Sequence, residues 1–482
     1  MKSLGSNSVL PPNIHILHLE GDDIPLDFGS DFFKNITHIY FKDSSRHNIH
    51  SFPPNLVYLQ FHNFHGEIDS FPSKLQTLIF GPWFNRTFAN IPYGLKYLDI
   101  GGSPNCKFES LPSTITTLIM SQSNSEITSL PQSLIHFEQR NEFKGDIRIL
   151  PRSIKTLSLG VYKEDYNGLL PESVLKLTIG RCDEGLIRNL PNGIRVLTFK
   201  SVKAEIIQFP LRLKELSIES KYLHPLTNLP QGLLYLRLMS FYEHELDFLP
   251  KSLIGFYFQY YRSHGEEGYA HQLDNLPLNL KKAFLDVGFI TELDYLPDHI
   301  THLTLGLYNQ SLDNLPSTLT TLIFNSHSKF NQRLDHLPKD LKWLVMPSEY
   351  NQPLDYLPNG LLWLELGNRF LKALKFLPQS LKVLTMKCEV LKRLEVLKDH
   401  SNLIHLGIAC YHASIKKKAP FTERNDKLGK CIRRQLLDMK IPSKKCVIDV
   451  LDAKKYTFIH PCHANNVFDI DIELQYLRRF YE

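Results

Sequence analysis

The stretch FNQRLDHLPKDLKWLVM, residues 330–346, decides the fold, because it is written again 20 residues later as YNQPLDYLPNGLLWLEL, residues 350–366. Both copies keep an aromatic residue, an Asn, a Leu-Pro pair and two Leu residues at fixed distances, whereas most other positions differ. Repetition with a period of about 20 residues is typical of a solenoid in which each copy forms one coil. Both copies also carry a Trp, Trp343 and Trp363, at a position that varies along the chain.

A Leu-Pro, Phe-Pro or Ile-Pro pair marks these units along most of the chain. Its proline occurs 18 times between Pro11 and Pro378, mostly 19 or 20 residues after the preceding one. Two segments, 32–41 and 396–408, keep the apolar frame without the proline, which makes 20 units between residues 10 and 412. Apolar residues follow at the third, sixth and usually eighth positions after the proline. The sixth and eighth alternate with other residues, which predicts a strand buried on one face.

One short strand per unit cannot bury its own apolar face, so neighbouring coils must stack and share a core. Proline has no backbone donor and fixes φ near −65°, so it suits an extended return segment better than a central strand or a helix. We therefore expect a mainly β solenoid, a leucine-rich-repeat-like superhelix of about 20 coils. It should have a parallel concave sheet, little helix on the convex side, and a small α/β cap at the C-terminus.

Further recurring residues resemble those of a known family. Eight positions before the proline an aromatic residue recurs, at Phe64, Phe84, Phe143, Tyr222, Tyr242, Tyr269, Phe289, Tyr308, Phe330, Tyr350 and Phe370. The next residue is Asn in several units, for example Asn309, Asn331 and Asn351. With the Leu-Pro frame, this pattern resembles the FNIP repeat, a short leucine-rich repeat abundant in social amoebae and in giant viruses that infect amoebae. The resemblance covers residues 10–412 and implies a binding module, in many relatives joined to an N-terminal F-box that docks onto a ubiquitin ligase.

The chain is predicted to hold two domains, a repeat solenoid at residues 1–412 and a basic cap at residues 413–482. Because the repeat begins by residue 10, we expect no F-box before it, and a substrate-recognition subunit of a ubiquitin ligase is kept as the alternative function. Residues 413–482 contain 15 Lys and Arg against 9 Asp and Glu. Their pattern predicts an amphipathic helix ending at Pro442, strands at 446–451 and 456–460, and a last helix at 472–482. Their simplest role is to cover the core of the last coil.

The composition of this basic region raises two other roles, nucleic acid binding and metal binding. Residues 413–445 hold 11 Lys and Arg against 3 Asp and Glu, a density that could contact phosphates, but no nucleic-acid-binding motif accompanies it. Zinc needs four converging ligands, and the region offers one close pair, in HPCH at residues 460–463. We therefore expect no nucleic acid partner, no metal and no cofactor.

Catalytic motifs are not found in the sequence. It contains no Gly-rich phosphate loop, nucleophile elbow or metalloprotease helix. Asp recurs three residues before the proline, for example at Asp313, Asp335 and Asp355, but a position repeated along the outside of a solenoid suits a structural role. Seven Cys without close spacing, no signal peptide and no long apolar run favour an intracellular, cytoplasmic monomer away from membranes, in the host cytoplasm if the protein is viral. We do not expect an enzyme.

The variable fifth and seventh positions of each unit should face outward on the concave sheet. Trp343 and Trp363 occupy the fifth position of adjacent coils, so we expect them about 5 Å apart and stacked. The step from Pro250 to Pro277 inserts about seven residues in a loop, another place where binding residues occur. We expect a non-catalytic scaffold that recognises a protein partner through this face. The predicted contact residues are Trp343, Trp363, Tyr58, Tyr97, Tyr235, Tyr257, Tyr260, Tyr261 and Arg262. Alternatively, the Trp pair only stabilises the sheet or lies under the C-terminal region, and the insertion is neutral.

Overall fold

The computed structural model describes residues 11–410 and 447–452, except residues 12, 21–27, 29–30, 46–47, 83, 85–90, 102–110, 122–126, 144, 163–169, 183–186, 240–241, 260–268, 270, 287–292, 294, 327, 368, 388–399 and 401. The chain divides into two compact units, residues 1–224 and residues 225–482. Each unit is described by itself below.

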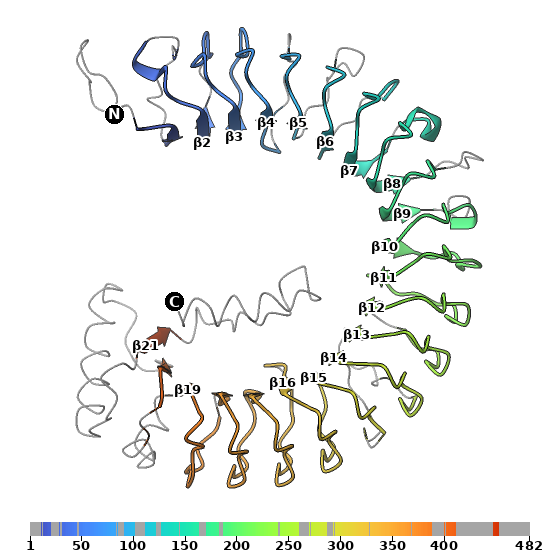
Figure 1. Cartoon of the computed structure of the whole chain (residues 1–482), viewed down its shortest axis with the longest axis vertical. Coiled ribbons are helices and arrows are strands. Elements are labelled where there is room, and N and C mark those ends of the chain that lie inside the picture. The colour runs from blue at the N-terminus through green and yellow to red at the C-terminus, as the bar shows by residue number, and fades with distance from the viewer. Residues whose placement is uncertain are drawn as a thin grey trace. The chain divides into compact units, whose positions relative to one another are not determined.

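Each unit is a stack of coils with one short strand in every coil, and every one of the predicted repeat units contributes a strand (Figure 1). The strands of the first unit are β1 Ile16–Leu19, β2 His38–Ser45, β3 Tyr58–Phe64, β4 Thr77–Ile79, β5 Tyr97–Asp99, β6 Thr117–Met120, β7 His136–Glu142, β8 Thr156–Tyr162, β9 Lys176–Cys182, β10 Val196–Val202 and β11 Glu215–Ile218. The strands of the second unit are β12 Tyr235–Met239, β13 Gly255–Gln259, β14 Lys282–Asp286, β15 His302–Leu305, β16 Thr321–Phe324, β17 Trp343–Val345, β18 Trp363–Glu365, β19 Val383–Lys387, β20 His405–Cys410 and β21 Val447–Asp452.

Helix contributes little to the described part of the chain. The helical elements named there are two 3-10 helices of three residues each, η1 Asp31–Phe33 and η3 Ile147–Ile149. No helix in the described residues is long and apolar enough to cross a bilayer. The predicted solenoid with little helix on the return side is therefore confirmed.

Neighbouring strands within each unit pair in parallel and in the register of the repeat. On β17 and β18, for example, Trp343 pairs with Trp363, and Leu344 pairs with Leu364. Because equivalent positions lie opposite one another, each position of the repeat forms a column that runs across the coils. The predicted parallel sheet is confirmed.

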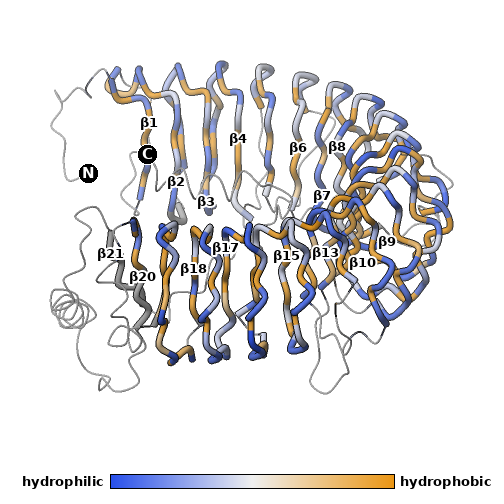
Figure 2. The backbone as a smooth tube through the Cα atoms, turned by 60° about the horizontal axis from the view of Figure 1, so that its bottom comes forward, coloured by the Kyte–Doolittle hydropathy of each residue, from blue (hydrophilic) through white to orange (hydrophobic). Residues whose placement is uncertain are grey.

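The core lies inside the coils and follows the predicted frame. Leu residues at the third and sixth positions, such as Leu341 and Leu344, are fully buried. The orange apolar positions in Figure 2 recur from coil to coil for this reason. Those aromatic residues eight positions before the proline that the structure describes are buried too. Phe330, Tyr350 and Phe370 stack in successive coils, with ring centroids 6.1 and 6.3 Å apart and interplanar angles of 4° and 1°.

The proline begins the turn that leads into each strand. The backbone N–H of the Leu three residues later donates to the proline carbonyl oxygen, for example from Leu361 to Pro358 at 3.1 Å. This bond closes a tight turn, after which the strand begins with the sixth residue facing the core. A short hydroxyl side chain two residues after the proline ties several turns to the preceding coil, as where Ser380 Oγ donates to the carbonyl oxygen of Leu361 at 2.6 Å.

The recurring Asn forms a hydrogen-bond ladder between coils. The side-chain oxygen of Asn309 accepts from the backbone N–H of Asn331 at 2.9 Å, and that of Asn331 accepts from Asn351 at 2.8 Å. The side-chain oxygen of Asn351 accepts in turn from the N–H of Leu371 at 2.9 Å. Beyond the strands these backbone donors lack sheet partners, and the Asn side chain supplies one.

Glycines that close strands allow successive coils to approach closely. A Cβ atom on Gly367 would lie 1.8 Å from the carbonyl oxygen of Pro347, and one on Gly180 would lie 1.8 Å from that of Gly160. No real Cβ fits at that distance, so only Gly is accommodated in the observed backbone.

The basic C-terminal region adds a strand to the second unit. The strand predicted at residues 446–451 is present as β21 and pairs in parallel with β20. The other predicted elements of this region and the predicted domain boundary at residue 413 lie outside the described residues. The role of this region as a cap stays a prediction.

Candidate partner-binding face

We call the outer sheet face the surface formed by the fifth and seventh residues after the proline, which are the first and third residues of most strands. In β17 and β18 these residues are half-buried, whereas the Leu between them is fully buried. Side chains of a strand alternate between its two faces, so the fifth and seventh residues point away from the core. The register and this burial pattern confirm the predicted outward face for β17 and β18, whereas on β13, β16 and β19 the same two positions are buried.

Trp343 and Trp363 form a stack on the outer sheet face of the second unit. Their ring centroids lie 5.4 Å apart with an interplanar angle of 15°. Each ring is half-buried, and the next residues along the column are Thr321 on β16 and Val383 on β19. The predicted stack is confirmed, and its role in binding stays a prediction.

A carboxylate beside the stack was missed in the sequence analysis. Glu365 follows Trp363 by two residues on the same face of β18 and pairs with Val345 and Thr385 on the neighbouring strands. Burial raises the pKa of Glu365 to about 7, and the neighbouring Trp363 acts in the opposite direction. Its place in the seventh position of the repeat, which is predicted to face outward, is the signal that marks this residue in the sequence.

The predicted contacts Tyr58, Tyr97 and Tyr235 lie on the outer sheet face and are half-buried. The hydroxyl of Tyr58 donates to Gln60 at 2.7 Å, and its ring lies 5.0 Å from the ring of Tyr40. Burial raises the pKa of Tyr58 and of Tyr97. Tyr58 and Tyr97 belong to the first unit, and Tyr235 and the Trp stack belong to the second.

Tyr257 lies on the same face but is only 4% exposed. Its ring stacks on Phe284 of the next coil at 4.1 Å and 7°, and the guanidinium carbon of Arg237 lies 4.9 Å from the ring centroid. Its hydroxyl donates to Gln259 at 2.9 Å. Neighbouring side chains therefore already take up most of the surface of this tyrosine. The predicted contacts at residues 260–262, which are Tyr260, Tyr261 and Arg262, lie outside the described residues.

A charged group on the outer sheet face of the first unit is paired within the molecule. Glu138 lies 2.8 Å from Arg140 Nε and 3.8 Å from His136 Nε2. The proximity of His136, and then the hydrogen bond and charge of Arg140, lower the pKa of Glu138 to about 2. This carboxylate differs from Glu365, for which no ion pair is found among the residues that the structure describes.

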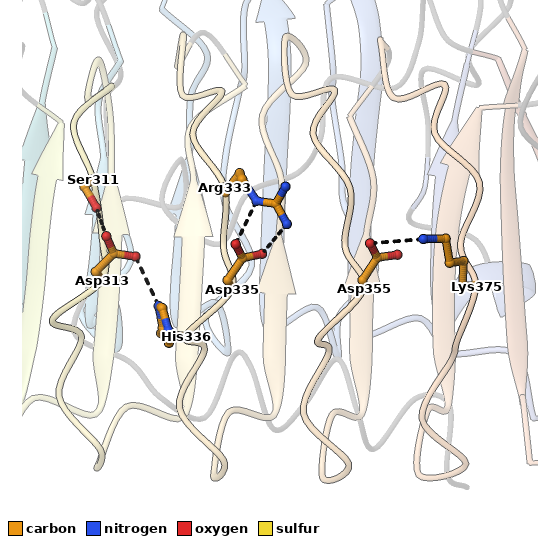
Figure 3. A network of polar contacts seen from close by, with 7 residues as sticks. All are labelled: Ser311, Asp313, Arg333, Asp335, His336, Asp355 and Lys375. Carbon is orange, nitrogen blue, oxygen red and sulfur yellow. Dashed lines mark hydrogen bonds and ion pairs between the residues drawn. The ribbon is translucent and has the colours of Figure 1, made fainter.

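The recurring Asp residues are also held by neighbours in their own or the next coil (Figure 3). Arg333 Nε and Nη2 donate to the two carboxylate oxygens of Asp335 at 2.7 and 3.2 Å. Asp313 accepts from Ser311 at 2.7 Å and lies 3.3 Å from His336 Nδ1, and these two contacts lower the pKa of Asp313. Within the described ranges, no group of three or more His, Cys, Asp or Glu side chains is placed to hold a metal ion.

Comparisons with known proteins agree with this architecture. The family model of the FNIP repeat matches residues 350–388, the segment that contains Trp363 and Glu365. No curated protein compared with the chain gives a significant match. The crystal structure of CroV588, described as a novel circular LRR protein, is 26% identical with a TM-score of 0.58. The alignment covers 86% of this chain, which spans 65% of the length of that chain.

A second similar structure is YopM from Yersinia enterocolitica WA-314, at 20% identity and a TM-score of 0.42 over 78% of both chains. The match to CroV588 fits the link to giant viruses that the repeat pattern implies. Residues 350–388 are thus an FNIP repeat, and the chain is a scaffold of the leucine-rich-repeat type.

Proposed function

We propose that the protein binds a protein partner through the outer sheet face of its second unit and that the stacked Trp343 and Trp363 are the centre of the contact. In this proposal the face binds the partner and does not catalyse a reaction. Binding comes from shape, apolar area and a few polar groups on a rigid sheet.

The observation that supports the proposal most is the Trp stack itself. Two large rings are held 5.4 Å apart on the side of the sheet that does not face the core. Because each ring restricts the other, little side-chain entropy remains to be lost when a partner packs against them. Trp is also the residue type most enriched among the side chains that dominate protein interfaces. A pair that served only the sheet would contribute roughly 0.2–1 kcal/mol to stability and nothing to binding.

The test compares three forms of the full-length protein as bait in native cell extracts. They are the wild type, the double variant Trp343→Ala with Trp363→Ala, and the control Tyr356→Ala. Tyr356 lies in the coil of Trp363 and is 63% exposed, but it lies outside the outer sheet face. We expect the wild type and the control to capture the same protein and the double variant to lose it.

The affinity of the captured protein is then measured with purified components. Removal of two central Trp side chains should weaken binding at least about 30-fold, which corresponds to about 2 kcal/mol. Equal capture by a correctly folded double variant would show that the partner binds elsewhere. Ubiquitin-ligase components among the captured proteins would support the alternative function that the repeat family implies.

A further inference from the structure

A polar hollow opens in the second unit beyond the ends of β15, β16 and β17. Its volume is about 630 Å³, which is in the range of pockets that hold small ligands. Side chains of three successive coils line it, and they are Asn309, Ser326, Lys329, Asn331, Ser348 and Glu349. All of these residues are polar and follow the strands rather than lying in them, so the hollow is separate from the outer sheet face.

The connection that follows β16 is longer than the one that follows β15. Five residues, 325–329, precede the next aromatic residue of the repeat, whereas two residues, 306–307, do so in the preceding coil. Asn325 fixes the longer connection, because its carbonyl oxygen accepts from the N–H of Ser328 at 2.9 Å and its side-chain amide donates to Asp286 at 3.0 Å. Extra residues in one coil of a repeat protein are a common place for binding groups.

The two Asn residues of the hollow hold oriented donors. Asn309 Oδ1 accepts from the backbone N–H of Asn331 at 2.9 Å, and Asn331 Oδ1 accepts from that of Asn351 at 2.8 Å. A planar amide that is held through its oxygen has its NH2 group directed to the other side. Among the described residues, neither of these NH2 groups has a hydrogen-bond partner. The ladder between coils therefore leaves one free donor group per coil beside the hollow.

The charges around the hollow favour an anion. Lys329 is exposed and forms no ion pair or hydrogen bond with the described part of the chain. Glu349 contributes a carboxylate, but Arg369 Nη1 lies 2.6 Å from its Oε2. Two positive side chains thus accompany one negative side chain, and the hydroxyls of Ser326 and Ser348 add further donors. A ligand with negative charge and several acceptor oxygens suits this set.

We propose that the hollow binds a phosphate group, with Lys329 as the counter-ion and the NH2 groups of Asn309 and Asn331 donating to its oxygens. A phosphate monoester has three terminal acceptor oxygens and roughly two negative charges at neutral pH, so it can use several donors at once. Lysine is a common ligand of phosphate, which it binds as a point charge. The site goes beyond the proposed function, because none of its residues belongs to the outer sheet face.

Calorimetric titration of the full-length protein tests the site with three probes. They are the peptide acetyl-Gly-phosphoSer-Gly-amide, the same peptide without the phosphate, and inorganic phosphate. We expect saturable binding of the phosphopeptide and none of the unphosphorylated peptide. Tighter binding of the phosphopeptide than of inorganic phosphate would identify a phosphorylated side chain of a protein as the source. Equal or tighter binding of inorganic phosphate would identify the free anion, and both results support the site.

The variant Asn331→Asp separates the two roles of this residue. It keeps an oxygen that accepts from Asn351, but it replaces the NH2 donor with a negatively charged oxygen, so phosphate should bind at least about tenfold more weakly. Asn351→Asp is the matched control, because Asn351 has the same role in the ladder and is not among the lining residues. It should bind the phosphopeptide as the wild type does.

The charge is tested in the same way. Lys329→Gln should weaken binding at least about tenfold, because the ligand loses its counter-ion. Lys339→Gln is the control, since Lys339 is an exposed lysine of the same unit that does not line the hollow.

Several results would overturn the inference. They are a lack of saturable binding of both phosphate probes, equal binding of the unphosphorylated peptide, unchanged affinity in Asn331→Asp and Lys329→Gln, or equal losses in the two controls. The urea midpoint of each variant shows whether it is folded, and Asn309→Asp takes the place of Asn331→Asp if that variant does not fold. No substitution in this set touches the outer sheet face, so these results are independent of the capture experiment with the Trp variants.

Discussion

Replacement of Glu365 by Gln should stabilise the second unit at neutral and alkaline pH and leave it unchanged in acid. The pKa of Glu365 is raised from 4.5 to about 7 in the folded protein, so the folded chain binds a proton more readily than the unfolded chain between these values. Below about pH 4.5 Glu365 is protonated in both states and does not reduce the free energy of unfolding. As the pH rises through 7, its ionisation in the folded protein reduces that free energy. The difference between these two pKa values corresponds to at most about 3 kcal/mol, because the side chain of Glu365 is only half-buried.

The assay is urea unfolding followed by Trp emission in the Trp83→Phe background, where the signal comes from Trp343 and Trp363. This local signal matters because a solenoid need not unfold in a single step. The difference in unfolding free energy between Glu365→Gln and its parent should be near zero at pH 4.5 and should approach 3 kcal/mol at pH 8. A difference that does not change with pH would refute the assignment of a raised pKa to this carboxylate.

Three further substitutions test the contacts between coils, each by the urea midpoint. Asn351→Ala should cost about 0.5–1.5 kcal/mol, because the exposed backbone N–H of Leu371 loses its acceptor to water, whereas Asn351→Asp keeps an acceptor oxygen and should cost less. Tyr308→Phe should cost about 1–3 kcal/mol, because the buried N–H of Leu293 loses the tyrosine hydroxyl, and an unchanged midpoint would show that this bond is dispensable. Gly367→Ala should cost about 1–3 kcal/mol, since its Cβ would overlap a carbonyl oxygen of the preceding coil, and a neutral result would show that the coils separate easily.

The stacked coils and the outward Trp pair could be predicted because both follow from local spacing. A period of about 20 residues and alternation within each strand are visible in the sequence, and in-register pairing then places equivalent positions opposite each other. The Asn ladder could not be predicted in the same way. Its partners are 20 to 22 residues apart, and the bond that Asn351 donates to Asn331 depends on the rise between coils, which residue spacing does not report.

The candidate site shows the same limit at two residues. Tyr257 has the type and position of a contact residue, yet it is buried because the bulky Phe284 pairs with it across a coil that is lengthened by the insertion. Glu365 looks like any surface carboxylate in the sequence. Its raised pKa depends on what lies beside it, and those neighbours come from two other coils.

The asparagine hydrogen bonds all run in one direction, because each coil supplies an oxygen to the following one and receives none back through this position. Each coil with this Asn therefore offers the same acceptor oxygen to the coil that follows it, whatever the sequence of that coil. If a whole block of 20 residues were deleted or duplicated, the Asn oxygen of one coil would meet the equivalent backbone N–H of its new neighbour. No other substitution would be needed to keep this hydrogen bond. The outer sheet face can thus be lengthened or shortened by one strand at a time. An insertion of any other length, such as the one between Pro250 and Pro277, has to form a loop outside the repeat.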